Sequence, residues 1–343
     1  MNGALAIDDN RLTRRGLLAA AGAAGVAILA ACGRTPDDDP AGAGSWSFTD
    51  DRGTVVRADG TPSRVVAFTG SAATLADYGL QDRLAGIFGD VTRSNGAKSE
   101  LAGDLDIGGV TVVGDTWGEF DMEKYAALEP DLLLTDMYVP DRLWYVPDES
   151  RSKIESINPN VAVIEVTEHS LLESIGRYEQ LAVALGADPA AAAVTQARAR
   201  FDAAARAVRE AAAAKPGLRV LAASAAPDTF YVSDPRVSAD LRYFRDELGV
   251  PLIIPERVDS GNYFQSLSWE NADKYPADLI LLDNRTSTLQ PDALTGKPLW
   301  RTLPAVRTGS ITEWSPVFRY SYAGMAPLLE RLAAAVRSAV PAA

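Results

Sequence analysis

Short apolar runs alternate with segments of helical periodicity along most of the chain. The runs typical of buried strands lie at residues 64–68, 84–88, 132–134, 161–166, 218–222, 279–282 and 310–314. Helical segments lie between them, at residues 71–80, 169–185 and 190–214. In the segment 169–185, apolar side chains recur at positions 171, 172, 175, 178, 181 and 185, which is a helical period. Strands that alternate with helices are typical of parallel βαβ units, so the pattern predicts an α/β fold with mostly parallel sheets.

A different pattern comes before the first of these strands. Turn-forming residues at 51–53 and 59–62 enclose the β-prone segment 54–56. Short extended segments bounded by Gly, Pro and Asp read as hairpins or edge strands. We expect such a hairpin or edge strand here.

Two segments of the chain match each other in register. The first reads DMEKYAALEPDLLLTD from Asp121, and the second reads SWENADKYPADLILLD from Ser268. Glu123 and Asp131 of the first correspond to Glu270 and Asp278 of the second, at a constant offset of 147 residues. The next predicted strand keeps this offset, since residue 164 corresponds to residue 311. A shared spacing over three landmarks predicts two related lobes.

The helical tract between the two copies predicts how the lobes are joined. Gly186 ends the first helix, and Asp188 and Pro189 are suited to begin the next as its cap and first residue. Two lobes joined by a long helix would move little relative to each other. We expect a first lobe at residues 47–167, a linking backbone helix at residues 168–187, a second lobe at residues 188–343, and a ligand cleft between the lobes.

The N-terminus has the features of an export signal. Arg14 and Arg15 precede an apolar run at residues 16–31, which is shorter than the ~20 residues that a spanning helix needs. The paired arginines resemble a twin-arginine signal, and an ordinary secretory signal is the alternative. The run ends Leu-Ala-Ala-Cys, which resembles a bacterial lipobox cleaved before Cys32. We therefore expect a signal peptide at residues 1–31 and a lipidated Cys32 that begins a flexible tether at residues 32–46, with no other contact to the membrane.

Composition removes several classes of function. The 343 residues are 47% hydrophobic and 23% charged, as in globular proteins, and the formal net charge of -13 disfavours nucleic acid as a partner. A single Cys excludes an intramolecular disulfide, and a single His excludes a zinc site built from several imidazoles. The sequence contains neither a Gly-x-Ser-x-Gly elbow nor a phosphate-binding Gly-rich loop with Lys. We expect a binding protein without cofactor or catalytic residues rather than an enzyme.

Taken together, the segment TPSRVVAF at residues 61–68, the repeated Glu-x7-Asp-Leu units and the linking helix resemble the helical-backbone class of periplasmic binding proteins. These proteins serve ABC importers of siderophores, haem and cobalamin, and the resemblance covers roughly residues 46–340. It implies that one exposed glutamate on each lobe, Glu123 and Glu270, docks onto arginines of the permease dimer, which works with a cytoplasmic ATPase. It also implies a monomer outside the cytoplasm that captures a metal chelate.

The chemistry of the segments that follow the predicted strands suits such a ligand. These segments carry aromatic side chains, which offer large flat surfaces with polar tips, and arginines, which match oxygen-rich anions. Ligands of two-lobed α/β proteins lie beyond the carboxyl ends of the strands. No cluster of carboxylates or imidazoles is suited to bare metal, so iron would be held only through its chelator. The candidate contacts are Phe88, Arg93, Trp117, Tyr138, Trp144, Tyr145, Tyr231, Arg236, Arg285, Trp314 and Arg319.

Several ligands and two other classes of function stay open. The acidic balance favours a ferric hydroxamate siderophore over a more anionic catecholate chelate. Haem would need an axial ligand, which Tyr138 or Tyr231 could supply. Cobalamin is a further alternative, because its recognition rests on aromatic stacking and peripheral hydrogen bonds. A surface lipoprotein without a small ligand and an exported hydrolase are the remaining alternatives.

Overall fold

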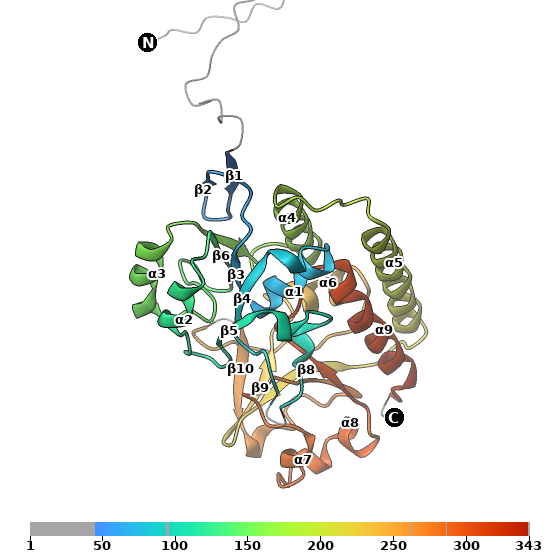
Figure 1. The fold of residues 1–343 in the computed structure, drawn as a ribbon. Coiled ribbons are helices and arrows are strands. Elements are labelled where there is room, and N and C mark those ends of the chain that lie inside the picture. The colour runs from blue at the N-terminus through green and yellow to red at the C-terminus, as the bar shows by residue number, and fades with distance from the viewer. Residues whose placement is uncertain (1–44, 94–95, 262, 286, 342–343) are drawn as a thin grey trace, which may run out of the picture. The chain divides into compact units, whose positions relative to one another are not determined.

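Two five-stranded sheets organise the part of the chain that the computed structural model describes, namely residues 45–93, 96–261, 263–285 and 287–341 (Figure 1). In the first sheet, every pair of neighbouring strands is parallel. Its strand order is β5 (Thr111–Gly114), β4 (Leu84–Phe88), β3 (Val65–Phe68), β6 (Leu132–Met137) and β7 (Val161–Glu165). The apolar runs of the sequence therefore form a sheet that is buried on both faces, as parallel sheets are.

The second sheet has the same size and one reversed strand. Its order is β10 (Phe264–Ser268), β9 (Thr229–Ser233), β8 (Val220–Ala225), β11 (Leu279–Asp283) and β12 (Ile311–Trp314). Strand β9 is antiparallel to both of its neighbours, so it alone among these strands runs against the others. Tyr231 was expected in a segment that follows a strand, and this was wrong, because it lies within β9. In β9 and β10, buried positions alternate with half-buried or exposed ones, so these strands lack the continuous apolar run that identifies a central strand.

The sheets match each other strand by strand and confirm two related lobes. Strands β6 and β11 begin 147 residues apart and hold the same place beside the central strands β3 and β8. Immediately before them, Asp131 accepts a hydrogen bond from the backbone N–H of Arg64 at 3.0 Å, and Asp278 accepts one from the N–H of Arg219 at 2.8 Å. The repeated Asp thus ties the start of one strand to its neighbour in each lobe.

Helices cover the sheets and connect them. The α-helices are α1 (Thr69–Asp77), α2 (Met122–Ala127), α3 (Arg151–Ile157), α4 (Leu171–Ala184), α5 (Ala192–Ala213), α6 (Ala239–Asp246), α7 (Pro291–Leu294), α8 (Pro304–Arg307) and α9 (Tyr322–Ser338). Short 3-10 turns are η1 (Gln81–Arg83), η2 (Glu100–Ala102), η3 (Ile107–Gly109), η4 (Asp148–Ser150), η5 (Trp269–Asn271) and η6 (Trp300–Thr302).

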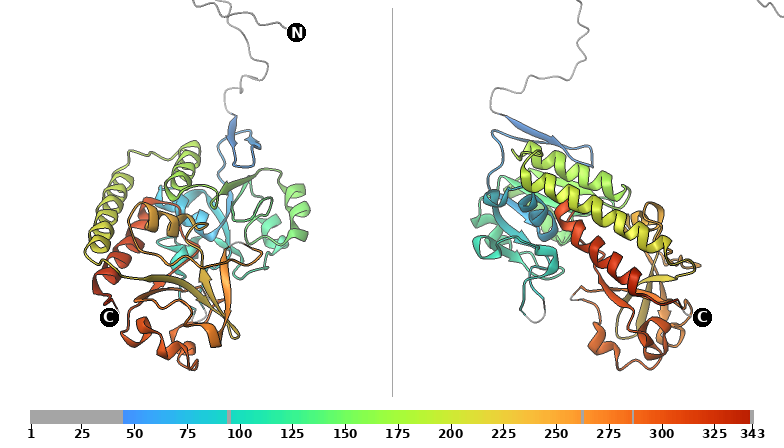
Figure 2. Two further views of the ribbon diagram at one scale, coloured as in Figure 1. Left: turned by 180° about the vertical axis from the view of Figure 1, so that it is seen from behind. Right: turned by 90° about the vertical axis from the view of Figure 1, so that its right-hand side faces the viewer.

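The crossing from the first lobe to the second consists of α4 followed by the longer α5. A capping box of Ser170 and Glu173 begins α4, which packs against β7 and α1 of the first lobe and α6 of the second. Helix α5 lies side by side with α9 (Figure 2). The expectation that Asp188 caps α5 was wrong, because the helix begins only at Ala192 and Asp188 instead accepts from the N–H of Ala190 at 2.9 Å.

The central strands divide their side chains between the two faces of each sheet. In β3, Val65 and Ala67 face a core shared by both lobes, whereas the alternate residues face a core of the first lobe alone. In β8, Val220 and Ala222 face the same shared core, and the alternate residues face a core of the second lobe. Helices α1, α4, α5, α6 and α9 also contribute to the shared core. One continuous apolar core therefore holds the two sheets in place relative to each other.

The predicted hairpin is present as β1 (Trp46–Thr49) and β2 (Val55–Ala58), paired antiparallel. It is fixed to α4, because the indole N–H of Trp46 donates to the carbonyl of Ala184 at 2.8 Å and Arg177 pairs with Asp51 at 2.6 Å. The hairpin thus joins the first lobe to the crossing helices.

Candidate functional site

A cavity of about 540 Å³ lies between the carboxyl ends of the strands of the two sheets. This volume is in the usual range for small-molecule sites. The first lobe contributes residues that follow β5, β6 and β7, and the second contributes residues from β8, β9 and β10 and from the segments after β11 and β12. We call it the main cavity. Its aromatic lining consists of Trp117, Tyr138, Trp144, Tyr231, Tyr263, Phe264, Trp314 and Tyr320.

The aromatic rings form packed groups rather than isolated contacts. In the first lobe, Trp144 lies 4.3 Å from Tyr138 and 4.9 Å from Trp117, measured between ring centroids. In the second lobe, Tyr231 and Phe264 meet edge to face at 4.7 Å. Rings that support each other in this way hold their orientation, so they offer a ligand large flat surfaces at little cost in entropy.

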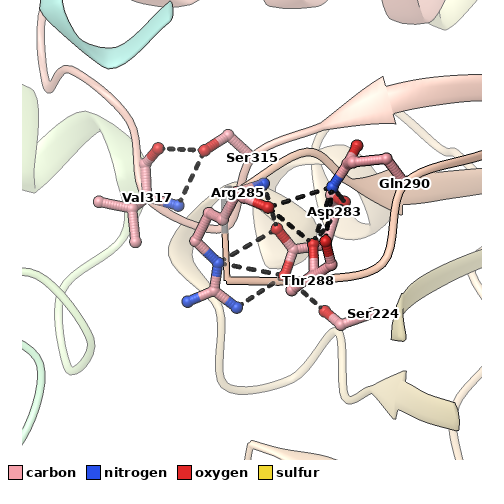
Figure 3. A network of polar contacts seen from close by, with 7 residues as sticks. All are labelled: Ser224, Asp283, Arg285, Thr288, Gln290, Ser315 and Val317. Atoms are coloured by element: carbon pink, nitrogen blue, oxygen red, sulfur yellow. Dashed lines mark hydrogen bonds and ion pairs between the residues drawn. The ribbon is translucent and has the colours of Figure 1, made fainter. Parts of the chain in front are cut away.

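Arg142 and Arg285 are the ionised side chains among the described residues that line the main cavity. Arg285 forms a fork with the buried carboxylate of Asp283, with nitrogen to oxygen distances of 2.6 to 3.1 Å (Figure 3). Burial opposes the charge of Arg285, but the hydrogen bonds and charge of Asp283 outweigh this and raise its pKa. Arg142 pairs with Asp148 at 2.5 Å. Each guanidinium thus lines the cavity while its charge is compensated by a carboxylate, Asp148 for Arg142 and Asp283 for Arg285.

The environment of Asp283 fixes the wall on the side of the second lobe. The hydroxyl of Ser224, which also lines the cavity, donates to Asp283 at 2.7 Å. Thr288 and Gln290 donate to the backbone carbonyl of Asp283 at 3.0 and 3.3 Å and hold the loop that carries Arg285 (Figure 3). The wall is therefore preorganised without a ligand.

A second buried carboxylate positions the indole of Trp314. Asp240 accepts from the indole N–H of Trp314 at 2.6 Å and from the hydroxyl of Ser238 at 2.6 Å, and both donors belong to cavity-lining residues. Burial raises the pKa of Asp240, and these hydrogen bonds oppose the rise. The polar edges of both side chains are thereby turned toward the carboxylate.

A third buried carboxylate, Asp136, lies behind the cavity in the first lobe. It accepts hydrogen bonds from the hydroxyls of Tyr178 and Ser71, while its other oxygen, Oδ2, has no partner among the described residues. Burial raises the pKa of Asp136 to about 7, against the opposing effect of these two bonds. The ring of Tyr178 stacks on Tyr320, whose hydroxyl meets that of Tyr138 at 3.4 Å, so this carboxyl underlies the tyrosines of the cavity.

Polar contacts join the lobes around the cavity. The hydroxyl of Tyr263 donates to the carbonyl of Tyr138. Glu100 of the first lobe accepts from Asn284 at 2.8 Å and from Arg331 at 2.7 Å, both of the second lobe. Together with the shared core, these contacts favour a preformed cavity.

The structure brings together six of the eleven residues that the sequence proposed as ligand contacts. These six line the main cavity: Trp117, Tyr138, Trp144, Tyr231, Arg285 and Trp314. Trp117 stands at the rim with 61% of its surface exposed. All six were predicted as residues at or after the ends of strands, where the sheets of both lobes present their carboxyl ends. This holds for Trp117, Tyr138, Trp144, Arg285 and Trp314, whereas Tyr231 lies within β9.

The other five lie elsewhere. Phe88 is fully buried in the core of the first lobe, and Tyr145 packs on Phe68 and lines a neighbouring cavity. Arg93 borders a small polar pocket of about 30 Å³. Arg236 pairs with Asp234 at 2.6 Å outside the main cavity, and Arg319 is enclosed in an ion pair with Asp77 at 2.8 Å. These five contribute no surface to the main cavity.

The candidate contacts left out Arg142, Tyr263, Phe264 and Tyr320, all of which line the main cavity. Arg142 lies in a loop of mixed polarity. Tyr263 directly precedes β10, a strand that the sequence did not predict. Tyr320 follows β12 and precedes α9, and only its place after a predicted strand could have marked it.

The two glutamates expected to dock lie at matching exposed positions. Glu123 is in the first turn of α2, and Glu270 is in η5. Both precede the repeated Asp and its strand by the same spacing. Cys32, Arg14 and Arg15 lie outside the described residues, as do the whole of 1–31 and most of the tether 32–46.

The described part of the chain lacks two features. None of its helices is long and apolar enough to cross a membrane. It also holds no group of three or more His, Cys, Asp or Glu side chains that could bind a metal ion.

Comparison with known proteins supports the architecture. Residues 65–317 match the family model described as periplasmic binding protein. The crystal structure of DesE, a ferric-siderophore receptor protein from Streptomyces coelicolor, is similar with 46% sequence identity and a TM-score of 0.82, over 87% of this chain and 100% of that one.

More distant structures share the fold. The petrobactin-binding protein YclQ from Bacillus subtilis is 17% identical with a TM-score of 0.62, over 86% of this chain and 99% of that one. FhuD2 from Staphylococcus aureus, solved with bound ferrioxamine B, is 17% identical with a TM-score of 0.57, over 80% and 98%. No curated protein sequence matches the chain. The family match over most of the chain and the similarity to DesE show that this chain belongs to the periplasmic binding protein family.

Proposed function

We propose that this protein is the extracytoplasmic substrate-binding component of an ABC importer and that it captures a ferric siderophore in the main cavity. The observation that carries the proposal is the lining of that cavity, which combines packed aromatic rings with two guanidinium groups. Aromatic faces suit the bulky organic shell of a chelate, and guanidinium donors suit its metal-bound oxygens. The similarity to DesE, at 46% identity, supports the same substrate class.

Within that class we favour a hydroxamate chelate. Arg285 is paired with Asp283 and Arg142 with Asp148, so the cavity offers guanidinium donors whose charge is compensated. The buried carboxyl groups of Asp136 and Asp240 lie behind the wall. A trianionic catecholate complex would find little net positive charge here, whereas a neutral or singly charged trihydroxamate complex would still gain the hydrogen bonds.

Titration of the soluble domain from residue 45 onward tests the proposal. Tryptophan fluorescence is the readout, because Trp117, Trp144 and Trp314 line the cavity. The ligand panel holds ferric trihydroxamates, ferric triscatecholates, ferric citrate, haem and cobalamin, with the iron-free chelators as controls. We expect saturable quenching at submicromolar concentration by ferric trihydroxamates.

Each other outcome has a defined meaning. Saturable quenching by catecholates alone would support siderophore binding but contradict the preference for hydroxamates. Saturable quenching by haem or cobalamin alone would show that this compound, and not a ferric siderophore, is the ligand. The absence of saturable binding for every ligand would contradict the proposed function.

The proposal includes an anchor and a partner. We propose that the chain is exported by the signal at residues 1–31 and held at the membrane through a lipid on Cys32. We further propose that it acts as a monomer and that Glu123 and Glu270, one exposed carboxylate on each lobe, dock on arginines of the permease. Pairs of arginine and carboxylate are directional, so two such points define one docking orientation.

A further inference from the structure

A second cavity of about 310 Å³ adjoins the main cavity within the first lobe, and we call it the side cavity. It shares Trp117, Val139, Arg142 and Trp144 with the main cavity, so the two spaces are neighbours along one wall. It continues past the buried residues 143, 145 and 146 to the exposed Asp148 and Glu149 in η4. Its volume is at the low end for small-molecule sites, which suits an arm of a ligand rather than a second ligand.

The wall of the side cavity is apolar and aromatic. Trp117 meets Tyr145 edge to face at 4.9 Å and Trp144 at the same distance. Leu143 and Val146 add aliphatic surface. An unbranched aliphatic chain could lie against these groups and be removed from water.

Its charge differs from that of the main cavity. The ionised groups among its described lining residues are two carboxylates, Asp148 and Glu149, and one guanidinium, Arg142. Arg142 pairs with Asp148, and Glu149 has no ion pair among the described residues. The outer end of the side cavity is therefore acidic, whereas the ionised groups at the main cavity are guanidinium groups.

From this arrangement we propose that the side cavity binds an aliphatic arm ending in an ammonium group, carried by a linear ferric trihydroxamate whose iron centre sits in the main cavity. This proposal rests on the proposed function and names its substrate class more narrowly. The chain of the arm lies on the aromatic and aliphatic wall, and its ammonium group reaches Asp148 and Glu149. A cyclic trihydroxamate has no such arm and leaves the side cavity empty.

Affinities for three ferric complexes test this proposal in the soluble domain. They are ferrioxamine B, which ends in an ammonium group, its N-acetyl derivative, which ends in a neutral amide, and a cyclic trihydroxamate of the same ring spacing. We expect ferrioxamine B to bind about two- to fivefold more tightly than its N-acetyl derivative at low salt, as exposed ion pairs allow. We expect the difference to shrink in 0.5 M salt, where exposed charges are screened.

The double variant Asp148→Asn with Glu149→Gln should abolish the preference, so that ferrioxamine B and its N-acetyl derivative bind with equal affinity. A matched control, Asp82→Asn with Glu155→Gln, removes two exposed carboxylates of the same lobe outside both cavities, and Glu155, like Asp148, pairs with an arginine. The control should keep the preference.

Failure of this proposal is distinct from failure of the proposed function. Equal affinity of the wild-type domain for ferrioxamine B and its N-acetyl derivative would overturn the ammonium site, as would a preference that survives in the double variant. Absence of binding by all three ferric complexes would instead contradict hydroxamate capture itself.

Discussion

Two arginines of the second lobe occupy nearly identical local settings but differ in their place in the fold. Arg285 pairs with Asp283, and Arg236 pairs with Asp234, in each case two residues along the chain and at 2.6 Å. Both carboxylates are buried. Only Arg285 of the two lines the main cavity. Comparing variants of Arg285 and Arg236 therefore distinguishes the effect of lining the cavity from the effect of pairing with a buried aspartate.

Arg285→Gln should therefore weaken the binding of the ferric chelate about tenfold, because a charge-assisted hydrogen bond is worth about 1.5–3 kcal/mol. Isothermal titration calorimetry would measure the change. Arg236→Gln is the matched control and should leave the affinity within about twofold. Equal losses in the two variants would show that Arg285 acts on the fold rather than on the ligand.

The buried carboxyl of Asp136 makes the stability of the protein depend on pH. Its pKa in the folded protein is raised to about 7, whereas an exposed aspartate in the unfolded chain titrates near 4. Between these values the folded protein holds a proton that the unfolded chain has released. The free energy of unfolding therefore falls as the pH rises from about 4 to about 7, by up to about 1.4 kcal/mol per pH unit, and this contribution is constant above that range.

Asp136→Asn removes this ionisation and keeps an oxygen that accepts from Tyr178. Urea unfolding at several pH values would show the variant gaining stability relative to the wild type from pH 5 to 7 and holding that gain at pH 8. A difference that does not change with pH would mean that Asp136 titrates outside this window.

Among the elements, the contact between α1 and the start of α9 is fixed by a nearly buried ion pair. Asp77, the last residue of α1, pairs with Arg319 at 2.8 Å and accepts from Ser321, the N-cap of α9. Burial raises the pKa of Asp77, and the charge of Arg319 opposes this rise. The pair crosses from the first lobe to the second.

Asp77→Ala should lower the free energy of unfolding by about 3 kcal/mol, because it leaves the guanidinium of Arg319 enclosed without its partner. The exposed pair of Arg151 and Glu155 provides the control, and Glu155→Ala should cost less than about 1 kcal/mol. Chemical denaturation measures both. Equal costs would contradict a structural role for the buried pair.

The elements also show which patterns are readable in a sequence. Strands β3, β4, β6, β7, β8 and β11 were predicted because continuous apolar runs identify strands that are buried on both faces. Strand β12 was also predicted, although only its last residue is buried. Strands β5, β9 and β10 were missed. In β9 and β10, which lie near the edge of the second sheet, buried positions alternate with half-buried or exposed ones. Such alternation with scattered aromatics resembles a loop, and the two segments are strands because β9 pairs with β8 and β10 pairs with β9.

For the whole molecule, the repeat of the two lobes places Glu123 and Glu270 at equivalent exposed positions. The shared core and the helices between the lobes hold these positions at a fixed separation. A rigid pair of carboxylates can match a fixed pair of arginines on a permease dimer.

The double variant Glu123→Ala with Glu270→Ala should lower siderophore uptake by at least about tenfold while leaving the affinity for the ferric chelate unchanged. Uptake of labelled iron by cells and calorimetry on the soluble domain give the two readouts. Glu155→Ala with Glu256→Ala removes one exposed glutamate from each lobe at other positions and should keep uptake normal. Persistent uptake in the first variant would contradict the docking proposal.

The sequence by itself determined the class of fold and the duplication of the lobes, because both follow from patterns of neighbouring residues. Apolar runs that alternate with helical periods specify parallel βαβ units, and a spacing of 147 residues repeats over several landmarks. The same patterns marked the segments after the strands, where Trp144 and Arg285 line the cavity.

Only the tertiary structure decided which of the candidate side chains share one cavity. Arg236 and Arg285 each pair with an aspartate two residues earlier in the chain, yet only Arg285 lines the main cavity. Phe88 and Trp314 both end strands, yet Phe88 is enclosed by the core of its lobe, whereas Trp314 lines the main cavity. The reason is that a cavity between two lobes is formed by contacts between residues far apart in the chain, and local periodicity carries no information about how the lobes are placed against each other.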